Sequence, residues 1–361
     1  MENNLINTKT IQIRRENVLK ILVTAEINQE LLKELYEFGE ITIAGWGKEL
    51  RKLEEDDMIQ LLKGKDILIT SYDPITKKVI DECKDLKLIA CTRANPVNID
   101  IKAAKERSIP VIYTPGRNSD CTAEFTIASM LSISRKIPMA YKSLKDGMHL
   151  ENKKVKNEIK EGLKEDVTWA LGAGTPYVLF KGIQLKGHIL GLIGYGSIGK
   201  KVANIARAFG MKIYVYDPLL SSVEINDNVQ EKVSLDKLFR ESDFISCHCK
   251  VDESTRGLIG KDEFEKMKKT AYFINTSRGA IVDEEALIEA LREEKIAGAA
   301  LDVFASEPIY KNHPFVIELD NIVITPHLAG ATYDAIDNHT IMIVEDVKRF
   351  INDEKLLYEY R

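Results

Sequence analysis

A glycine-rich turn between two apolar segments constrains this chain more than any other feature. Residues 188–193 form a short, mostly apolar run, typical of a parallel strand that is buried on both faces. The turn Gly194-x-Gly196-x-x-Gly199 follows and opens a helix. The apolar residues of that helix recur at helical spacing: Val202, Ile205, Ala206 and Phe209. The pattern predicts the first strand, turn and helix of a doubly wound α/β sheet.

The three glycines have distinct physical roles in such a turn. Gly194 permits the tight turn, Gly196 lets a pyrophosphate approach the backbone, and Gly199 allows the helix to pack closely on the strand. The free N–H groups at the start of the helix, where Ser197 and Ile198 lie, then face the anion together with the helix dipole. This context favours a dinucleotide site over a purely structural turn.

The carboxylate that follows the second strand indicates which dinucleotide binds. Asp217 ends the apolar run 211–216 and lies 18 positions after Gly199. A carboxylate about 20 residues after the turn is expected to take the ribose hydroxyls of the adenosine half. Residues 218–222 contain no Arg or Lys that could hold a 2′-phosphate, so NAD is favoured over NADP.

The bulk composition excludes several other classes of protein. The 361 residues suffice for two domains, and a net charge of −5 gives no support to a nucleic-acid partner or an anionic membrane. The apolar runs are strand-sized, which predicts no membrane span, and the N-terminus lacks the pattern of a secretory signal. The five cysteines are scattered, as expected for a reducing compartment, so we expect a cytoplasmic protein.

One short motif, Cys247-His248-Cys249, invites a metal-site hypothesis. These residues end an apolar run in which alternate side chains point to opposite faces, and no second Cys/His cluster stands nearby to complete a tetrahedral site. A strand end is therefore favoured over zinc, and no metal is predicted.

Strands and helices alternate along two long stretches of the chain. The expected strands of the first stretch are Lys20–Thr24, Ile41–Ala44, Asp66–Thr70, Leu88–Cys91 and Val111–Tyr113, and those that follow the glycine turn in the second are Met211–Tyr216, Asp243–Cys247, Ala271–Ile274, Gly298–Asp302 and Ile322–Ile324. This rhythm predicts two parallel sheets, each covered on both faces by helices. Residues 124–135 are expected to form an apolar helix, 141–166 a charge-rich connecting helix and loop, and 333–350 the final helix.

Polar residues that could perform chemistry follow three of these strands. Ligands of open α/β sheets bind at the carboxyl ends of strands, which makes such positions site candidates. Taken singly, each has a structural alternative: an ion pair for Arg278, exposed loop acids for Asp302 and Glu307, and a histidine satisfied by the backbone for His327.

Together these residues match the needs of hydride transfer between NADH and a ketone. Arg278 can anchor a 2-oxo acid by its carboxylate and polarise the carbonyl group. His327 can donate the proton, and Glu307, if paired with it, would stabilise the protonated imidazole. Asp302 would hold the nicotinamide end of NAD.

Four motifs in order give the chain a family resemblance. They are the glycine turn ending at Tyr216-Asp217-Pro218, Asn275-Thr-Ser-Arg278-Gly-Ala-Ile-Val-Asp283, Leu301-Asp302-Val-Phe-x-x-Glu307-Pro308 and Thr325-Pro-His327-Leu-Ala-Gly-Ala-Thr332. From residue 88 to 332 the chain resembles the D-isomer-specific 2-hydroxyacid dehydrogenases, which include phosphoglycerate dehydrogenase.

The resemblance implies a fold, a domain division and roles for named residues. A Rossmann NAD-binding domain (117–330) would be inserted in a flavodoxin-like substrate domain (1–116 and 331–361). The implied catalytic set is Arg278, Glu307 and His327, and the implied NAD-binding residues include Asp217, His248, Thr276, Asp302 and the glycine turn. A homodimer built through the cofactor domains is also implied, with residues 124–135 at the interface.

The chain departs from the family in its substrate loop. After Arg93 the family commonly has glycines whose N–H groups hold the substrate carboxylate, whereas this chain has Ala94-Asn95-Pro96-Val97-Asn98. Proline lacks an N–H, so Asn95 or Asn98 is expected to help bind the substrate. This polar loop favours a phosphorylated or hydroxylated acid, such as phosphoglycerate or a short sugar acid.

Two other functions are compatible with the same scaffold. Formate or phosphite oxidation is one, but formate dehydrogenases of this family place Gln beside the histidine where this chain has Glu307. The other is a non-catalytic NAD(H)-sensing interaction protein, which the complete catalytic set disfavours.

Overall fold

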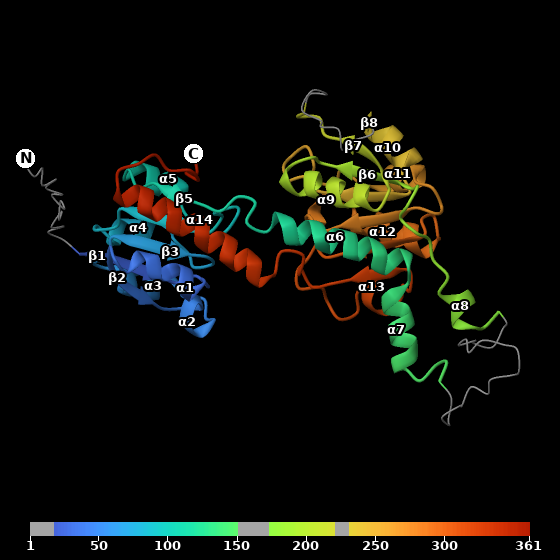
Figure 1. The fold of residues 1–361 in the computed structure, drawn as a ribbon, viewed down its shortest axis with the longest axis horizontal. Coiled ribbons are helices and arrows are strands. Elements are labelled where there is room, and N and C mark those ends of the chain that lie inside the picture. The colour runs from blue at the N-terminus through green and yellow to red at the C-terminus, as the bar shows by residue number, and fades with distance from the viewer. Residues whose placement is uncertain (1–17, 151–172, 221–230) are drawn as a thin grey trace, which may run out of the picture. The chain divides into compact units, whose positions relative to one another are not determined.

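The computed structural model of the protein describes residues 18–150, 173–220 and 231–361, which belong to two compact units (Figure 1). The first unit is formed by residues 1–117 and 333–361, and the second by residues 118–332. Among the described helices, none combines the length and apolar composition that crossing a bilayer requires. The assignment of substrate binding to the first unit stays a prediction.

The first unit contains a five-stranded sheet in which all neighbouring strands are parallel. In chain order the strands are β1 (Leu19–Val23), β2 (Gly39–Ile43), β3 (Ile67–Thr70), β4 (Leu88–Cys91) and β5 (Val111–Ile112). They lie in the order β2-β1-β3-β4-β5. This is the flavodoxin-like order, which confirms the predicted fold of this unit.

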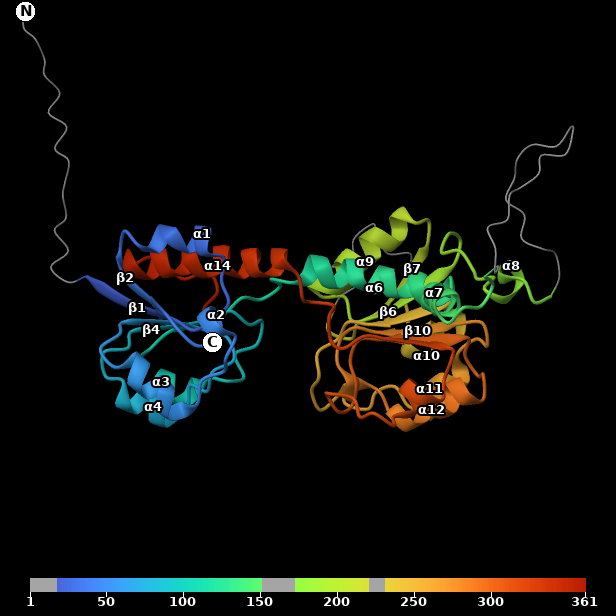
Figure 2. The same cartoon turned by 90° about the horizontal axis from the view of Figure 1, so that it is seen from below.

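Helices cover both faces of this sheet (Figure 2). One face carries α1 (Gln29–Leu32), the 3₁₀ turn Lys33–Leu35 and α14 (Tyr333–Ile351), and the other carries α3 (Glu55–Leu62), α4 (Lys77–Glu82) and α5 (Ile101–Glu106). Successive residues of β1 serve the two layers, since Leu22 packs with Met58 whereas Val23 packs with Leu32. Burial on both faces explains why these strands are apolar throughout.

The end of the chain pairs with the edge of this sheet. Asp346 of α14 is fully buried, and its two carboxylate oxygens accept hydrogen bonds from the N–H groups of Leu357 and Tyr358, each at 2.8 Å. The segment then runs antiparallel to β5, where Tyr360 N donates to Val111 O at 2.7 Å. The buried carboxylate thus directs the last residues to cover the open strand edge.

A buried histidine makes the stability of the first unit sensitive to pH. His339 of α14 lies between Glu26 O, 2.8 Å from its Nε2, and Arg117 Nη1, 3.3 Å from its Nδ1. Burial lowers the pKa of His339 to about 4. The unfolded state therefore binds a proton at His339 more readily than the folded state does. The contribution of His339 to stability is fully present above pH 6.5 and is lost as the pH falls toward 4.

Protonation of His339 is expected to lower the free energy of unfolding by about 2 kcal/mol between pH 7.5 and pH 5. Denaturant unfolding of the wild type and of His339→Gln at the two pH values measures it, because the variant lacks that share of the pH dependence. Identical pH dependence in both proteins would contradict the assignment.

The second unit contains a seven-stranded sheet, again with parallel neighbours. Its strands are β6 (Ile189–Ile193), β7 (Lys212–Tyr216), β8 (Glu231–Lys232), β9 (Phe244–Cys247), β10 (Tyr272–Asn275), β11 (Gly298–Leu301) and β12 (Ile322–Ile324). They lie in the order β12-β11-β10-β9-β6-β7-β8. Counted within this unit, the first six strands follow the order 3-2-1-4-5-6 of the Rossmann fold, as predicted. The exposed, two-residue β8 was not predicted, since it has no apolar run.

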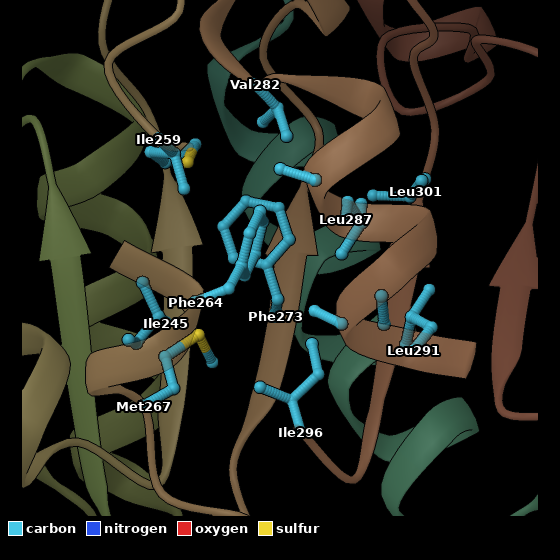
Figure 3. Packing of buried hydrophobic residues seen from close by; sticks show 14 of the residues in the cluster. Ile245, Ile259, Phe264, Met267, Phe273, Val282, Leu287, Leu291, Ile296 and Leu301 are labelled. Carbon is cyan, nitrogen blue, oxygen red and sulfur yellow. The ribbon is translucent and has the colours of Figure 1, made fainter. Parts of the chain in front are cut away.

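The helices of the second unit form two layers. On one face α6 (Ser119–Ser134) and α9 (Ser197–Ala208) pack on the sheet, and on the other lie α10 (Leu235–Glu241), α11 (Lys261–Lys266) and α12 (Glu284–Arg292). Figure 3 shows the second layer, where the rings of Phe264 and Phe273 meet edge to face with centroids 5.5 Å apart. Phe209, expected on the apolar face of α9, is instead 43% exposed because the helix ends at Ala208.

The described residues of this unit also form the short helices α7 (Ile137–Lys145), α8 (Pro176–Leu179) and α13 (Pro314–Ile317). The predicted connecting helix begins earlier than expected, as α7. The rest of the charge-rich segment, residues 151–172, lies outside the described residues. Both α7 and α8 expose apolar side chains, among them Tyr141 and Tyr177.

Candidate active site

The predicted site residues of the second unit all follow the carboxyl ends of strands. Because the strands are parallel, these ends form one edge of the sheet. The residues are distributed as follows: Asp217 after β7, Gly194 after β6, His248 after β9, Thr276 and Arg278 after β10, Asp302 and Glu307 after β11, and His327 after β12. At about 4.8 Å per strand, β7 and β11 are ~19 Å apart, a span suited to an extended ligand.

The glycine turn has the shape that a pyrophosphate site needs. Gly194 adopts a φ of +95°, and a Cβ there would lie 2.7 Å from Cys249 N. A Cβ on Gly199 would meet Gly194 O at 2.4 Å, so the helix start packs closely against the turn. A Cβ on Gly196 meets nothing within 4 Å, so the backbone here faces open space. The N–H groups at the start of the twelve-residue α9 therefore fit a phosphate group.

We expect Gly196→Ala to weaken NADH binding at least tenfold without unfolding the protein. The added methyl group has room in the protein but occupies the space that a pyrophosphate would use. Gly174→Ala is the matched control, because a Cβ at Gly174 also meets nothing within 4 Å. Fluorescence titration with NADH measures the dissociation constants, and equal values for both variants would contradict this use of the turn.

Asp217 links the glycine turn to the end of β7. Its Oδ2 accepts a hydrogen bond from Tyr195 N at 2.9 Å, and its Oδ1 accepts one from Leu219 N at 3.0 Å. A carboxylate has about four acceptor positions, so Asp217 retains capacity for ribose hydroxyls. The predicted contact with the adenosine half stays a prediction.

His248 is a neutral residue in the middle of this edge. It is half-buried, its Nε2 lies 2.9 Å from Ser246 Oγ, and burial lowers its pKa to about 3. Burial likewise raises the pKa of the neighbouring thiols, to about 11 for Cys249. The described residues contain no cluster of His, Cys, Asp and Glu that could hold a metal ion.

Glu307 and His327 form a close pair at the far end of the edge. Glu307 Oε2 lies 2.6 Å from His327 Nδ1, and Glu307 Oε1 accepts a hydrogen bond from Phe304 N at 3.1 Å. The imidazole is about half exposed, and its Nε2 forms no hydrogen bond with the described residues. His327 has a φ of +57°, a left-handed conformation that is uncommon outside glycine and often found at functional sites.

Asp302 holds the turn that carries this histidine. The carboxylate is buried and accepts hydrogen bonds from Thr325 Oγ1 at 2.6 Å, Leu328 N at 2.8 Å and Ala329 N at 2.7 Å. In addition, His327 N donates to Asp302 O at 2.9 Å. Asp302 therefore has a structural role that the sequence reasoning did not foresee, and its contact with nicotinamide stays a prediction.

Arg278 is exposed and forms no ion pair with a carboxylate in the described parts of the chain. Its Nη1 donates to Ser277 O at 2.7 Å. The following Gly279 brings two loops together, because a Cβ there would lie 2.0 Å from Phe304 O. The arginine loop thus packs directly against the loop that leads to Glu307. Thr276, by contrast, is buried, with its Oγ1 2.9 Å from Thr126 Oγ1.

Of the predicted substrate-binding residues, Asn95 and Asn98 lie in the first unit, after β4, and differ in their surroundings. Asn95 is exposed. Asn98 is half-buried, and its Nδ2 donates to Asp73 O at 2.8 Å, which braces two loops. Asn98 thus has a structural role, whereas the Asn95 amide is the more available of the two. Substrate binding by either residue stays a prediction.

Sequence reasoning missed an aromatic pair next to Arg93. The guanidinium carbon of Arg93 lies 4.8 Å from the centroid of the Tyr72 ring, and Tyr72 in turn contacts Trp46 edge to face at 5.5 Å. Trp46 begins the short helix α2 (Trp46–Glu49) after β2, and Tyr72 follows β3. Both residues follow the end of a strand, and this position could have identified them from the sequence.

These features define a dinucleotide-binding α/β protein with an arginine, a glutamate and a histidine at one sheet edge. Comparison with known proteins gives the family. The model for the NAD binding domain of D-isomer specific 2-hydroxyacid dehydrogenases matches residues 127–329. The chain belongs to this family. It is an NAD-dependent 2-hydroxyacid dehydrogenase, so the predicted enzyme class and cofactor are confirmed.

Relatives cover nearly the whole chain. YoaD of Bacillus subtilis is 37% identical over 341 residues, which are 94% of this chain and 92% of YoaD. A glyoxylate reductase of Thermococcus litoralis is 34% identical, with 93% and 94% covered. A D-3-phosphoglycerate dehydrogenase of Methanocaldococcus jannaschii is 35% identical over 93% of this chain, but this chain spans only 58% of that enzyme's length.

Solved structures agree with the fold. The crystal structure of the TT0316 protein from Thermus thermophilus has a TM-score of 0.76 and 30% sequence identity. The alignment covers 95% of this chain and all of that one.

Proposed function

We propose that the protein interconverts a small D-2-hydroxy acid and its 2-oxo acid, with Arg278, Glu307 and His327 as its catalytic residues. The observation that carries this proposal is the 2.6 Å contact between Glu307 and His327. The loop that leads to Glu307 packs against the loop of Arg278, whose guanidinium donates only to a backbone oxygen among the described residues. Bound NADH supplies the hydride to the carbonyl carbon. The glycine turn and Asp217 would hold its diphosphate and adenosine half.

The remaining steps belong to the protein's own side chains. The Arg278 guanidinium matches a substrate carboxylate with two parallel hydrogen bonds and polarises the adjacent carbonyl oxygen. His327 donates a proton from Nε2 to that oxygen, since Nδ1 is taken by Glu307. The Glu307 carboxylate stabilises the imidazolium before the transfer and orients its ring. In the oxidative direction, His327 receives the proton.

We propose a polar acid, hydroxylated or phosphorylated, as the substrate. The exposed Asn95 and the Arg93 guanidinium offer hydrogen-bond donors to hydroxyl or phosphate oxygens. Tyr72, which contacts Arg93, and Trp46, which contacts Tyr72, lie in the same unit. Relatives named as glyoxylate reductases and phosphoglycerate dehydrogenases support the class without selecting one substrate.

The experiment that tests both proposals is NADH oxidation, followed by the loss of NADH absorbance. The panel is glyoxylate, pyruvate, hydroxypyruvate and phosphohydroxypyruvate. We expect turnover, with a higher kcat/KM for the hydroxylated or phosphorylated acids. A preference for pyruvate would contradict the substrate proposal. Absence of turnover with every acid, while NADH still binds, would favour a sensor role instead.

A homodimer is proposed on different grounds. Exposed apolar side chains gather on and beside α7 and α8, namely Ile137, Tyr141, Leu144, Met148, Leu150, Tyr177, Val178 and Leu179. Helix α6, expected at the interface, packs Ala123, Ile127 and Met130 into the core of its own unit, and its place in an interface stays a prediction. Light scattering of Tyr141→Asp should show a shift toward monomer if this face is the interface. A cytoplasmic location stays a prediction.

A further inference from the structure

The loop that carries Glu307 is held from outside by a second carboxylate. We call residues 303–308 the glutamate loop. The N–H of Phe304 donates to Glu307 itself, and the next N–H, that of Ala305, donates to Glu284 Oε2 at 2.9 Å. Two consecutive backbone donors are therefore occupied by two different carboxylates. The position of Glu307 depends on Glu284 as well as on its own loop.

Glu284 is fixed at its other oxygen by a buried histidine. It is the first residue of α12, and its Oε1 lies 3.0 Å from His313 Nε2. His313 is 3% exposed and is the N-cap of α13, where its Nδ1 accepts a hydrogen bond from Phe315 N at 3.1 Å. An accepting Nδ1 carries no hydrogen, so this network assigns the proton of a neutral ring to Nε2, which donates to Glu284.

The histidine ring has little freedom to move. Its centroid lies 4.8 Å from the Tyr310 ring and 4.6 Å from the Phe315 ring. A backbone hydrogen bond, two aromatic contacts and the Glu284 carboxylate therefore fix it on several sides. The chain of contacts runs from His313 through Glu284 to Ala305, two residues before Glu307.

We propose that Glu284 and His313 are positioning residues for the reaction. They fix the glutamate loop so that Glu307 Oε2 meets His327 Nδ1 at hydrogen-bond distance. This inference rests on the proposed function in that it takes the Glu307–His327 pair as the catalytic acid. Displacement by about 1 Å costs up to a hundredfold in rate at such a site, although neither positioning residue need contact substrate.

Two substitutions separate positioning from folding. Glu284→Gln retains one oxygen, so either Ala305 N or His313 Nε2 loses its acceptor. His313→Asn keeps a side chain that caps α13 but is too short to reach Glu284. The matched control is Glu285→Gln, because Glu285 is exposed in the same first helical turn and has the same charge.

Steady-state kinetics supply the first readout. We expect Glu284→Gln and His313→Asn to lower kcat about 10- to 100-fold with an unchanged NADH dissociation constant, and Glu285→Gln to match the wild type. In a double-mutant cycle, Glu284→Gln should have little further effect in a Glu307→Gln background, because it acts through Glu307. Additive effects, or lower thermal stability with wild-type kcat, would overturn the proposal.

A second readout does not require turnover. In spectra of protein labelled with nitrogen-15 in histidine, the hydrogen bond between His327 and Glu307 should give a deshielded ring proton, assigned by its loss in Glu307→Gln. Glu284→Gln and His313→Asn should shift or abolish this signal, whereas Glu285→Gln should retain it. An unchanged signal in both variants would overturn the positioning role. A wild type inert toward all 2-oxo acids would overturn the proposed function alone.

Discussion

Replacement of His327 by alanine is expected to lower kcat by about 10²- to 10⁴-fold and to leave NADH binding unchanged. The imidazole is proposed as the proton donor to the carbonyl oxygen, and no other titratable group of the described residues forms a comparable close pair with Glu307. Its removal leaves hydride transfer without a positioned acid. The glycine turn follows β6 and His327 follows β12, so the substitution leaves the proposed cofactor site at the turn unchanged.

His188→Ala is the matched control for this experiment. His188 is also a partly exposed histidine of the second unit, with its Nδ1 3.3 Å from Asp243 Oδ2. It precedes β6 and so lies at the opposite edge of the sheet, away from the site. Stopped-flow or steady-state kinetics with the best acid of the panel give kcat. A His327→Ala enzyme with wild-type kcat would show that another group, or water, donates the proton.

Replacement of Arg278 by alanine is expected to lower kcat/KM by about 10²- to 10⁴-fold. Two charge-assisted hydrogen bonds to the substrate carboxylate would be lost, at roughly 1.5–3 kcal/mol each. The loss should fall on both KM and kcat, because the guanidinium is proposed to bind the carboxylate and to polarise the carbonyl. Arg278→Lys should recover only part of the activity, since an ammonium group lacks the planar fork.

The control for Arg278 is an arginine on the surface. Arg240→Ala removes a guanidinium from α10 whose Nε lies 2.9 Å from Asp236, an exposed pair expected to matter little. Its kinetic constants should match those of the wild type. If Arg278→Ala has the kcat/KM of the wild type, as the control Arg240→Ala should, another residue anchors the substrate carboxylate. Arg93 would then be the next residue to replace.

Much of the scaffold could be predicted because short-range rules decide it. β4 spans the predicted residues Leu88–Cys91, and β7, which Asp217 follows, comes after the glycine turn and its helix as expected. Buried parallel strands are apolar, and at a φ of +95° any residue other than glycine is strained. Both features therefore leave a pattern in the sequence. Phe209 was misassigned because it is the C-cap of α9, one position after the last helical residue, where its side chain is 43% exposed.

The candidate site was likewise predictable only in part. The residue types of Arg278, Glu307 and His327 follow from strand ends and motifs, but the contacts that orient them do not. The three hydrogen bonds from residues 325–329 to Asp302 join segments more than twenty positions apart. The chain of contacts from His313 to Ala305 likewise links α12, α13 and the glutamate loop.

By itself, then, the sequence determined the alternation of strands and helices, the dinucleotide turn and the identity of the residues at the sheet edge. These depend on periodicity and on single residues whose backbone or chemistry is special. Only the tertiary structure decided that Asp302 shapes the turn of His327, that Asn98 braces a loop and that Asp346 directs the end of the chain to β5. Such roles depend on which hydrogen-bond partners a side chain meets, and the packing between distant segments determines those partners.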